Sequence, residues 1–338
     1  MFPCWTLLLD AHTWCLQAAP MDHNLQYWRR EGQSFFQRLF HWVDILDPSS
    51  LLASDGEIKN SRSLLESKEQ ANKDELKVKE AWKLSLSSVH PDTGSVLPLV
   101  FRPPAFLPLA APLVIATLLP HKGVKPALFW QFLFQSYSAG FNYVNRNATS
   151  CKDERIPLKQ VLLFVGSVSY ATCAGVGSPS ASMNRYGLNS PAMQSLFRRI
   201  VPVPLFASLS ALSVLVVRGE EFENGIEVVD STGNVVGVSQ TAGMKAVKET
   251  AISRAALIGT TAAVPNVIVS FLQRTSFIKR NPLVLAPFRH ITTALVLGLM
   301  IPISFSLFPQ SGKVMKEDLE AHIQAATTEP DLYYHRGL

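Results

Sequence analysis

Six apolar segments without a charged residue dominate the C-terminal two-thirds of the chain. They cover residues 103–120, 127–144, 160–184, 200–217, 255–273 and 291–312. A helix of eighteen residues rises about 27 Å, close to the roughly 30 Å hydrocarbon core of a bilayer. Six such segments, separated by connectors that carry Lys and Arg, predict an all-α membrane protein. We expect a polytopic helical bundle with about five transmembrane helices, which leaves one of the six segments free to lie at the interface.

The remaining patterns divide the chain into four parts. Residues 1–20 are an uncertain leader, because they imitate a secretory signal but lack its basic n-region; whether Met1 or Met21 is the start stays open. Residues 21–98 predict a soluble helical N-terminal region. Residues 99–312 form the transmembrane region, interrupted by a hydrophilic loop at 218–254 in which residues 226–238 predict a small β-hairpin. Residues 313–338 form a C-terminal tail.

A short amphipathic helix is expected near the start of the N-terminal region. Between Gln33 and Val43, aromatic residues mix with Arg38 and His41, and the pair Asp47-Pro48 ends the helix. Packing of this helix against the rest of the protein is favoured over contact with a membrane surface.

Composition and charge agree with a membrane protein. Charged residues make up 17% of the chain, against about 25% in an average soluble domain. The net charge of +5 arises in the apolar part, since residues 1–98 carry an acidic excess. This distribution suits positively charged connectors between spans rather than a nucleic-acid interface, so we expect no nucleic-acid partner.

The sequence shows no catalytic or metal-binding pattern. The four cysteines form no CxxC pair, and no Cys/His cluster has metal-ligand spacing. Walker A, nucleophile-elbow, HExxH and Rossmann patterns are also missing. We therefore expect no enzyme activity, no metal and no cofactor, and any transport would be passive or exchange-driven. A secretory-pathway protein is a weaker alternative, which glycosylation at Asn147 would reveal.

Polar residues along the second apolar segment are the first candidates for a binding site. Gln131, Gln135 and Asn142 follow one another at spacings of four and seven, which places them on one stripe of a helix. Such a stripe faces other helices or a water-filled path, because lipid cannot satisfy it. Asn145 and Arg146 end the segment, where amide and guanidinium groups could bind a carboxylate. The alternative for Arg146 is that it anchors the helix end at the interface.

A second polar cluster precedes the first apolar segment. It is a five-residue stretch made of His90, Pro91, Asp92, Thr93 and Gly94. It could shape one mouth of a path through the membrane. The alternative is a simple turn that ends one helix and leads into the next.

These two clusters resemble motifs of the sideroflexin family of mitochondrial inner-membrane proteins. HPDTG stands complete at 90–94, and residues 128–146 match the family's LFWQ, QS and NY.NR stretch. Further matches lie in the hydrophilic loop and in the tail, so the resemblance covers residues 33–338. The N-terminal QSF and LDP sequences and the YHRG ending look most like the divergent fourth animal branch of the family.

The resemblance implies a multi-pass carrier, located in the mitochondrial inner membrane, that moves small amino acids such as serine. Asn142, Asn145 and Arg146 would then contact the substrate carboxylate, and Gln131 and Gln135 would line the path.

The chain also departs from the family pattern. Its fourth span has Ser213-Val214-Leu215 where the family has Asn-x-Pro, and Ser95 replaces an acidic residue after HPDTG. The loss of an intramembrane amide is expected if a substrate site has changed. The alternative function is therefore a non-transporting membrane adaptor that supports respiratory complex I assembly and iron–sulfur or iron homeostasis. It would dock through the N-terminal region and the 218–254 loop.

Overall fold

The computed structural model describes residues 23–32, 34–66, 75–119, 124–147, 161–162, 165–173 and 202–338. The predicted leader and most of the apolar segment 160–184 lie outside these residues, and the described parts of that segment are helical. Helices form most of the described structure, and they are joined by one four-stranded sheet.

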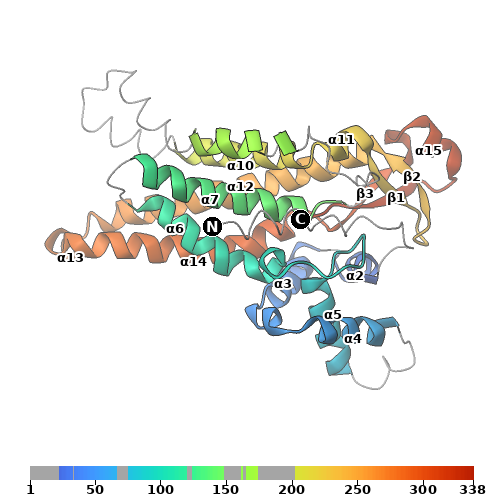
Figure 1. Cartoon of the computed structure of the whole chain (residues 1–338), viewed down its shortest axis with the longest axis horizontal. Helices are drawn as coiled ribbons and strands as arrows, with labels where there is room; N and C mark the ends of the chain where they lie inside the picture. The colour runs from blue at the N-terminus through green and yellow to red at the C-terminus, as the bar shows by residue number, and fades with distance from the viewer. Residues whose placement is uncertain are drawn as a thin grey trace.

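The N-terminal region is helical as predicted. It consists of α2 (His23–Glu31), α3 (Phe35–Ile45), α4 (Asp55–Glu66) and α5 (Glu75–Ser88). In Figure 1 these helices lie on one side of the remaining structure, towards the end that carries the sheet.

The predicted amphipathic helix is α3. Ser34 accepts a hydrogen bond from the Gln37 backbone, while the Gln37 side chain accepts one from the Ser34 backbone, so a capping box fixes the start of the helix. Its inner face buries Trp42, which confirms the expected packing. Phe36 and Phe40 point away from that face and are each 68% exposed.

Several of the described helices run side by side along the long axis of the molecule (Figure 1). They are α6 (Phe106–Leu118), α7 (Val124–Val144), α10 (Pro202–Val217), α12 (Gln240–Leu272) and α14 (Leu285–Ser306). α12 packs along both α10 and α14. The short α13 (Ser276–Arg280) lies at one end of this bundle, and the sheet with α15 (Ala321–Ala326) lies at the other.

Two described helices, α12 with 33 residues and α14 with 22, are long and apolar enough to cross a membrane. α6 and α10 are apolar but shorter, at 13 and 16 residues. α7 has 21 residues and carries the polar stripe. The bundle with about five spans stays a prediction.

A four-stranded antiparallel sheet joins the hydrophilic loop to the tail. The predicted hairpin is confirmed as β1 (Ile226–Val229) and β2 (Val235–Ser239), and the short α11 (Glu220–Asn224) precedes it. Gly225 starts the hairpin with φ +77°, where a side chain would collide with the backbone of Ser239.

The tail contributes the other half of the sheet. It forms β3 (Ser311–Met315) and β4 (Asp331–His335), in the order β2-β1-β4-β3. The predominantly helical fold class is confirmed, and the small sheet extends beyond the predicted hairpin because the tail pairs with the loop. Val314, Leu332 and Tyr334 bury their side chains and secure this arrangement.

An aromatic core connects the N-terminal region to the bundle. The rings of Trp28 and Trp42 stack with centroids 5.2 Å apart, and Trp42 meets Phe305 of α14 edge-on at 5.0 Å. Phe106 and Phe141 extend the cluster across α6 and α7, with centroids 4.6 Å apart. Aromatic contacts of this kind add to the free energy gained from burial.

Asp47 connects α3 to the following 3-10 helix and to α5. Its Oδ2 accepts from Lys83 Nζ at 2.5 Å, and its Oδ1 accepts from the Ser49 backbone N–H at 2.9 Å. The hydrogen bond from Lys83, followed by those from Ser49, lowers the pKa of Asp47 to about 2.

We expect Asp47→Ala to lower the free energy of unfolding by about 1 kcal/mol near neutral pH, through loss of a helix cap and of a solvent-screened ion pair. The folded-state pKa lies below the ordinary value of 3.8. The carboxylate's contribution is therefore complete above the ordinary value and disappears as the pH falls towards about 2. Denaturant titrations of wild type and variant at several pH values check this, and a difference that does not narrow in acid would contradict it.

Candidate functional site

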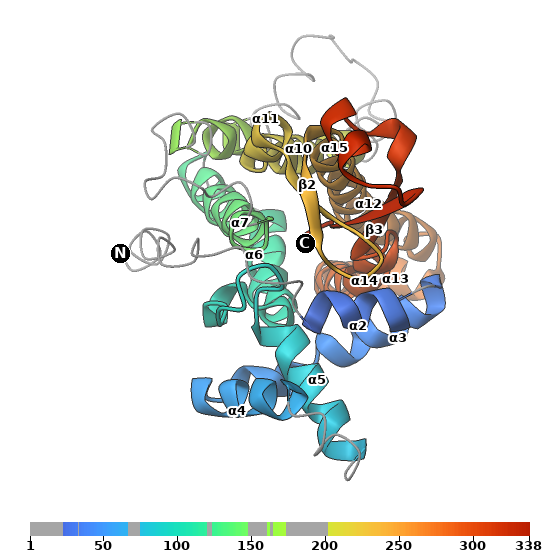
Figure 2. The same ribbon diagram turned by 90° about the vertical axis from the view of Figure 1, so that its right-hand side faces the viewer.

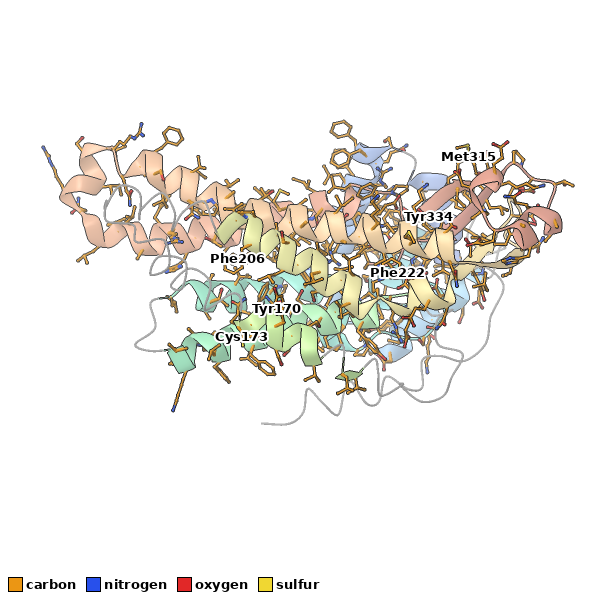
Figure 3. The ribbon with its side chains drawn as sticks, turned by 90° about the horizontal axis from the view of Figure 1, so that it is seen from above. Tyr170, Cys173, Phe206, Phe222, Met315 and Tyr334 are labelled. Atoms are coloured by element: carbon orange, nitrogen blue, oxygen red, sulfur yellow. The ribbon has the colours of Figure 1, made fainter. Side chains whose placement is uncertain are left out.

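A cavity of about 180 Å³ lies inside the helical bundle, bordered by α6, α7, α10, α12 and α14. Its apolar wall includes Val114, Phe134 and Phe206. Figure 3 shows Phe206 well separated along the long axis from Tyr334 of β4, so the cavity belongs to the helical part and not to the sheet end. An apolar cavity of roughly 150 Å³ accepts benzene, so this one has room for a molecule the size of a small amino acid.

The structure places both predicted glutamines in the cavity wall. Gln131 and Gln135 lie one helical turn apart on α7 and are 5% and 6% exposed. Ser138 continues the same wall towards the sheet end. These two buried glutamines offer amide donors and acceptors to the cavity.

α12 supplies oxygen atoms to the opposite wall through Thr261, Pro265 and Asn266. Pro265 has no backbone N–H, so the Thr261 carbonyl lacks its usual helical donor. The Thr261 hydroxyl donates to the Leu257 carbonyl at 2.7 Å, and the Asn266 amide donates to the Ala262 carbonyl at 2.8 Å. Because these donors are engaged within the helix, the Thr261 carbonyl and the side-chain oxygens of Thr261 and Asn266 are the atoms available to accept hydrogen bonds from a ligand.

Positive charge enters the wall through Arg289 at the start of α14, one turn before Thr293. None of the described residues that line the cavity is acidic. As far as the described residues show, the cavity is thus a mostly apolar chamber with three amides, several hydroxyls and one guanidinium. This combination suits a small, polar, anionic or zwitterionic ligand.

The other predicted binding residues do not line the cavity. Asn142 accepts from Arg254 Nε at 3.1 Å, and Asn145 donates to the Phe101 and Phe141 carbonyls at 3.0 and 2.9 Å. Arg146 forms an ion pair with Glu220 at 3.2 Å. The structure therefore separates these three side chains from the two glutamines and engages them in contacts nearer the sheet end.

The predicted gate, residues 90–94, is held by two other segments. His90 Nε2 lies 2.8 Å from the Arg146 carbonyl, and Asp92 Oδ1 lies 2.7 Å from His335 Nδ1 of β4. The turn itself is tightened by the Gly94 N–H, which donates to the His90 carbonyl at 2.9 Å, with Gly94 at φ +67°. Pro91 and Thr93 belong to the same turn.

A fully buried ion pair lies at the sheet end of the bundle. Arg218 Nε and Nη2 donate to the two carboxylate oxygens of Glu221 at 2.6 and 2.8 Å, and both side chains are 0% exposed. Asn147 donates to Glu221 at 2.9 Å, and Arg218 also donates to Thr250 at 2.9 Å. Every polar atom of the carboxylate is thereby occupied within the protein.

The last residues of the chain run into this same region. Seen along the long axis, the C-terminal end lies near the middle, between α7 and the sheet (Figure 2). The Arg336 carbonyl accepts from Arg218 Nη2 at 2.6 Å, and Arg336 Nη2 donates to the Phe305 carbonyl at 3.1 Å. Burial lowers the pKa of Arg336 to about 10, while the negative charge of Glu249 acts in the opposite direction.

Among the described residues, no three His, Cys, Asp or Glu side chains come close enough to hold a metal ion. Residues 22–338 match the family described as Sideroflexins. The chain belongs to the sideroflexin family.

Several relatives of this sideroflexin are similar over almost their whole length. Sideroflexin-4 of Danio rerio is 52% identical over 318 residues, which cover 94% of this chain and 100% of the relative. Sideroflexin-4 of Homo sapiens is 39% identical over 322 residues, or 94% and 93% of the two chains. Sideroflexin-5 of Homo sapiens is 32% identical over 314 residues, or 92% and 91%. The predicted likeness to the fourth animal branch is confirmed, and no solved structure matches the chain significantly.

Sequence reasoning missed several cavity residues of this sideroflexin. Arg289 lies in a charged connector just before the last apolar segment, where a basic residue is ordinary and does not stand out. The available signal was its spacing of four from Thr293, which places both on one helical face. The sequence gave no indication that Ser210 and Thr261 line a cavity. A hydroxyl in an apolar helix can equally donate to the backbone carbonyl one turn earlier in the same helix.

Proposed function

We propose that this protein is a secondary carrier of small amino acids in the mitochondrial inner membrane, built as a multi-pass bundle of about five spans. The observation that carries the proposal is the cavity between the five helices, with its amides, hydroxyls and single guanidinium. Sideroflexins are in general mitochondrial transporters, which supports this function.

The outer surface of the bundle supports a place in a membrane. Ile291, Leu295 and Leu299 follow at spacings of four along α14 and are 59%, 62% and 67% exposed. Val267 and Phe271 of α12 add exposed fractions of 53% and 64%. An exposed apolar stripe of this size on a helical bundle fits contact with lipid chains.

The cavity can bind the two charged ends of an amino acid differently. Arg289 would attract the carboxylate, and the oxygens of Gln131 and Gln135 and the carbonyl of Thr261 would accept from the ammonium group. Since the described part of the wall holds no carboxylate, the ammonium group would bind the neutral oxygens there. This keeps affinity moderate, as a carrier that must release its substrate requires.

Uptake of radiolabelled glycine, L-alanine and L-serine into proteoliposomes tests the carrier function. We expect saturable uptake by the wild type and a loss of at least about tenfold in Ser210→Phe, whose ring would fill the cavity. Ser208→Phe is the matched control, because Ser208 is exposed on the same helix and its substitution leaves the cavity open. No saturable uptake by folded wild type would overturn the carrier, and normal uptake by Ser210→Phe would overturn the cavity as its path.

A second candidate is the non-transporting adaptor for respiratory complex I assembly and iron–sulfur or iron homeostasis. Exposed apolar side chains on the N-terminal region favour it, chiefly Leu52 at 88% and Leu76 at 76% exposure. Such side chains are suited to docking a protein partner. The adaptor function would survive Ser210→Phe in cells that depend on the protein, which separates it from transport.

A further inference from the structure

Arg254 of α12 is a buried cation of unusual surroundings. Arg254 is only 3% exposed, and its Nε donates to Asn142 Oδ1 at 3.1 Å. Its Nη2 atom is buried and has no hydrogen-bond partner. Among the described residues, no carboxylate forms an ion pair with it.

The other buried arginines differ from Arg254 in the partners of their guanidinium groups. Arg218 and Arg146 each face a glutamate, and Arg102 faces Asp55 at 3.2 Å. Arg38 donates to two backbone carbonyls. Arg102 Nη1 and Arg336 Nε also lack a hydrogen-bond partner, but Arg102 has Asp55 as its counter-ion and Arg336 donates to both Ser253 Oγ and the Phe305 carbonyl. Arg254 combines an unsatisfied nitrogen with a single hydrogen bond, to Asn142, and no carboxylate partner among the described residues. Such an arrangement costs free energy unless an anion is supplied.

Aromatic rings surround the guanidinium instead of acids. Its carbon lies 4.6 Å from the ring centroid of Phe305, 5.5 Å from that of Phe141 and 5.7 Å from that of Phe106. Cation–π attraction from these rings holds the charge in place. The rings cannot accept a full hydrogen bond from Nη2, so they stabilise the positive charge without neutralising it.

The cavity ends one helical turn from Arg254. Ile258, four residues further along α12, lines the cavity, and so does Ser138, whose carbonyl accepts from the Asn142 amide at 2.9 Å. Ser210, another wall residue, donates to the Arg254 carbonyl at 3.4 Å. Arg289 lies in the wall at the start of α14, near α13, so the two cations lie at opposite ends of the chamber.

We propose that Arg254, positioned by Asn142, is a second anion site on the substrate path, and that it receives the carboxylate of a small amino acid from the cavity. The inference rests on the proposed carrier function. A substrate carboxylate attracted by Arg289 would move towards the sheet end and bind the unsatisfied N–H groups of Arg254. The three phenylalanine rings exclude water from that position and must shift as the carboxylate enters.

An anion-binding role for Arg254 predicts a different result from a purely structural role. Removal of a buried cation that lacks a counter-ion relieves a desolvation cost, so Arg254→Gln should unfold at the same temperature as wild type or higher. Uptake by the same variant should fall by at least about thirtyfold, because a charged contact to the substrate is lost. Arg274→Gln is the matched control, since Arg274 is exposed just beyond the same helix.

The decisive experiment combines uptake with thermal unfolding of the full-length protein in detergent, using L-serine, acetate and L-serinamide as probes. We expect L-serine and acetate to raise the unfolding temperature of wild type and Arg274→Gln, L-serinamide to leave it unchanged, and Arg254→Gln to respond to none of them. A lower unfolding temperature for unliganded Arg254→Gln, or a retained response to carboxylates, would overturn the anion site while leaving the carrier standing.

The two proposals can fail separately. If no amino acid is taken up but carboxylates stabilise wild type and not Arg254→Gln, the anion site stands and the carrier function falls. If wild type takes up amino acids and Arg254→Gln does so equally well, the carrier stands and the anion site falls. If carboxylates stabilise neither protein, the anion site is overturned whatever the uptake shows.

Discussion

Trp42→Ala is expected to lower the free energy of unfolding by about 3–5 kcal/mol, the usual cost of removing a large buried aromatic side chain. Trp42 is 2% exposed and forms the link between α3 and the bundle. Its ring stacks on Trp28 and meets Phe305 of α14, so the substitution leaves a void with aromatic walls. Denaturant titration of the purified protein, followed by circular dichroism, measures the change.

Phe40→Ala is the matched control on the same helix. Phe40 is 68% exposed, so its loss should change the free energy of unfolding by no more than about 0.5 kcal/mol. If Trp42→Ala and Phe40→Ala lower the free energy of unfolding equally, α3 does not pack against the bundle through one face only. If neither variant lowers it, the aromatic core does not anchor the N-terminal region.

The helical architecture was predictable because local patterns specify it. Amphipathic spacing gave α3, and the turn at 231–234 between alternating segments gave the β1–β2 hairpin. The partners of that hairpin were not predictable. β3 and β4 are five-residue strands that pair with each other, and the pairing of β4 with β1 joins segments about a hundred residues apart, which no local pattern encodes.

The candidate site was predictable only where a single helix carries it. Gln131 and Gln135 lie in the cavity because their spacing of four puts them on the inner stripe of α7. Asn145 and Arg146 continue the same sequence motif, but the helix ends at Val144 and turns them towards Phe101 and Glu220. Arg146 therefore looked free for a carboxylate until its acidic partner, 74 residues away, was known.

The same reasoning explains why Arg254 escaped notice. It was placed at the border between the hydrophilic loop and an apolar segment, where a charge is ordinary. α12 instead continues without interruption from Gln240 to Leu272, so Arg254 lies inside a long helix and under three aromatic rings. Burial of that kind depends on tertiary packing and is invisible in the sequence.

Glu221→Gln is expected to cost about 3–5 kcal/mol of the free energy of unfolding, because it leaves Arg218 buried without its counter-charge. The glutamine has nearly the same shape, so the loss reports charge rather than volume. It also turns one accepting oxygen into an amide that faces donors of Arg218 and Asn147. The result is a buried cation that lacks a partner and a donor placed against donors.

Glu223→Gln is the control for this substitution. Glu223 lies two residues further along α11 and is exposed, so its change should shift the free energy of unfolding by no more than about 0.5 kcal/mol. Arg218 also holds the Arg336 carbonyl and Thr250, so Glu221→Gln should loosen the tail and the start of α12 together. Amide hydrogen exchange should therefore become faster in β4 and around Thr250. If neither the exchange rates there nor the free energy of unfolding change, the buried ion pair does not stabilise the sheet end of the bundle.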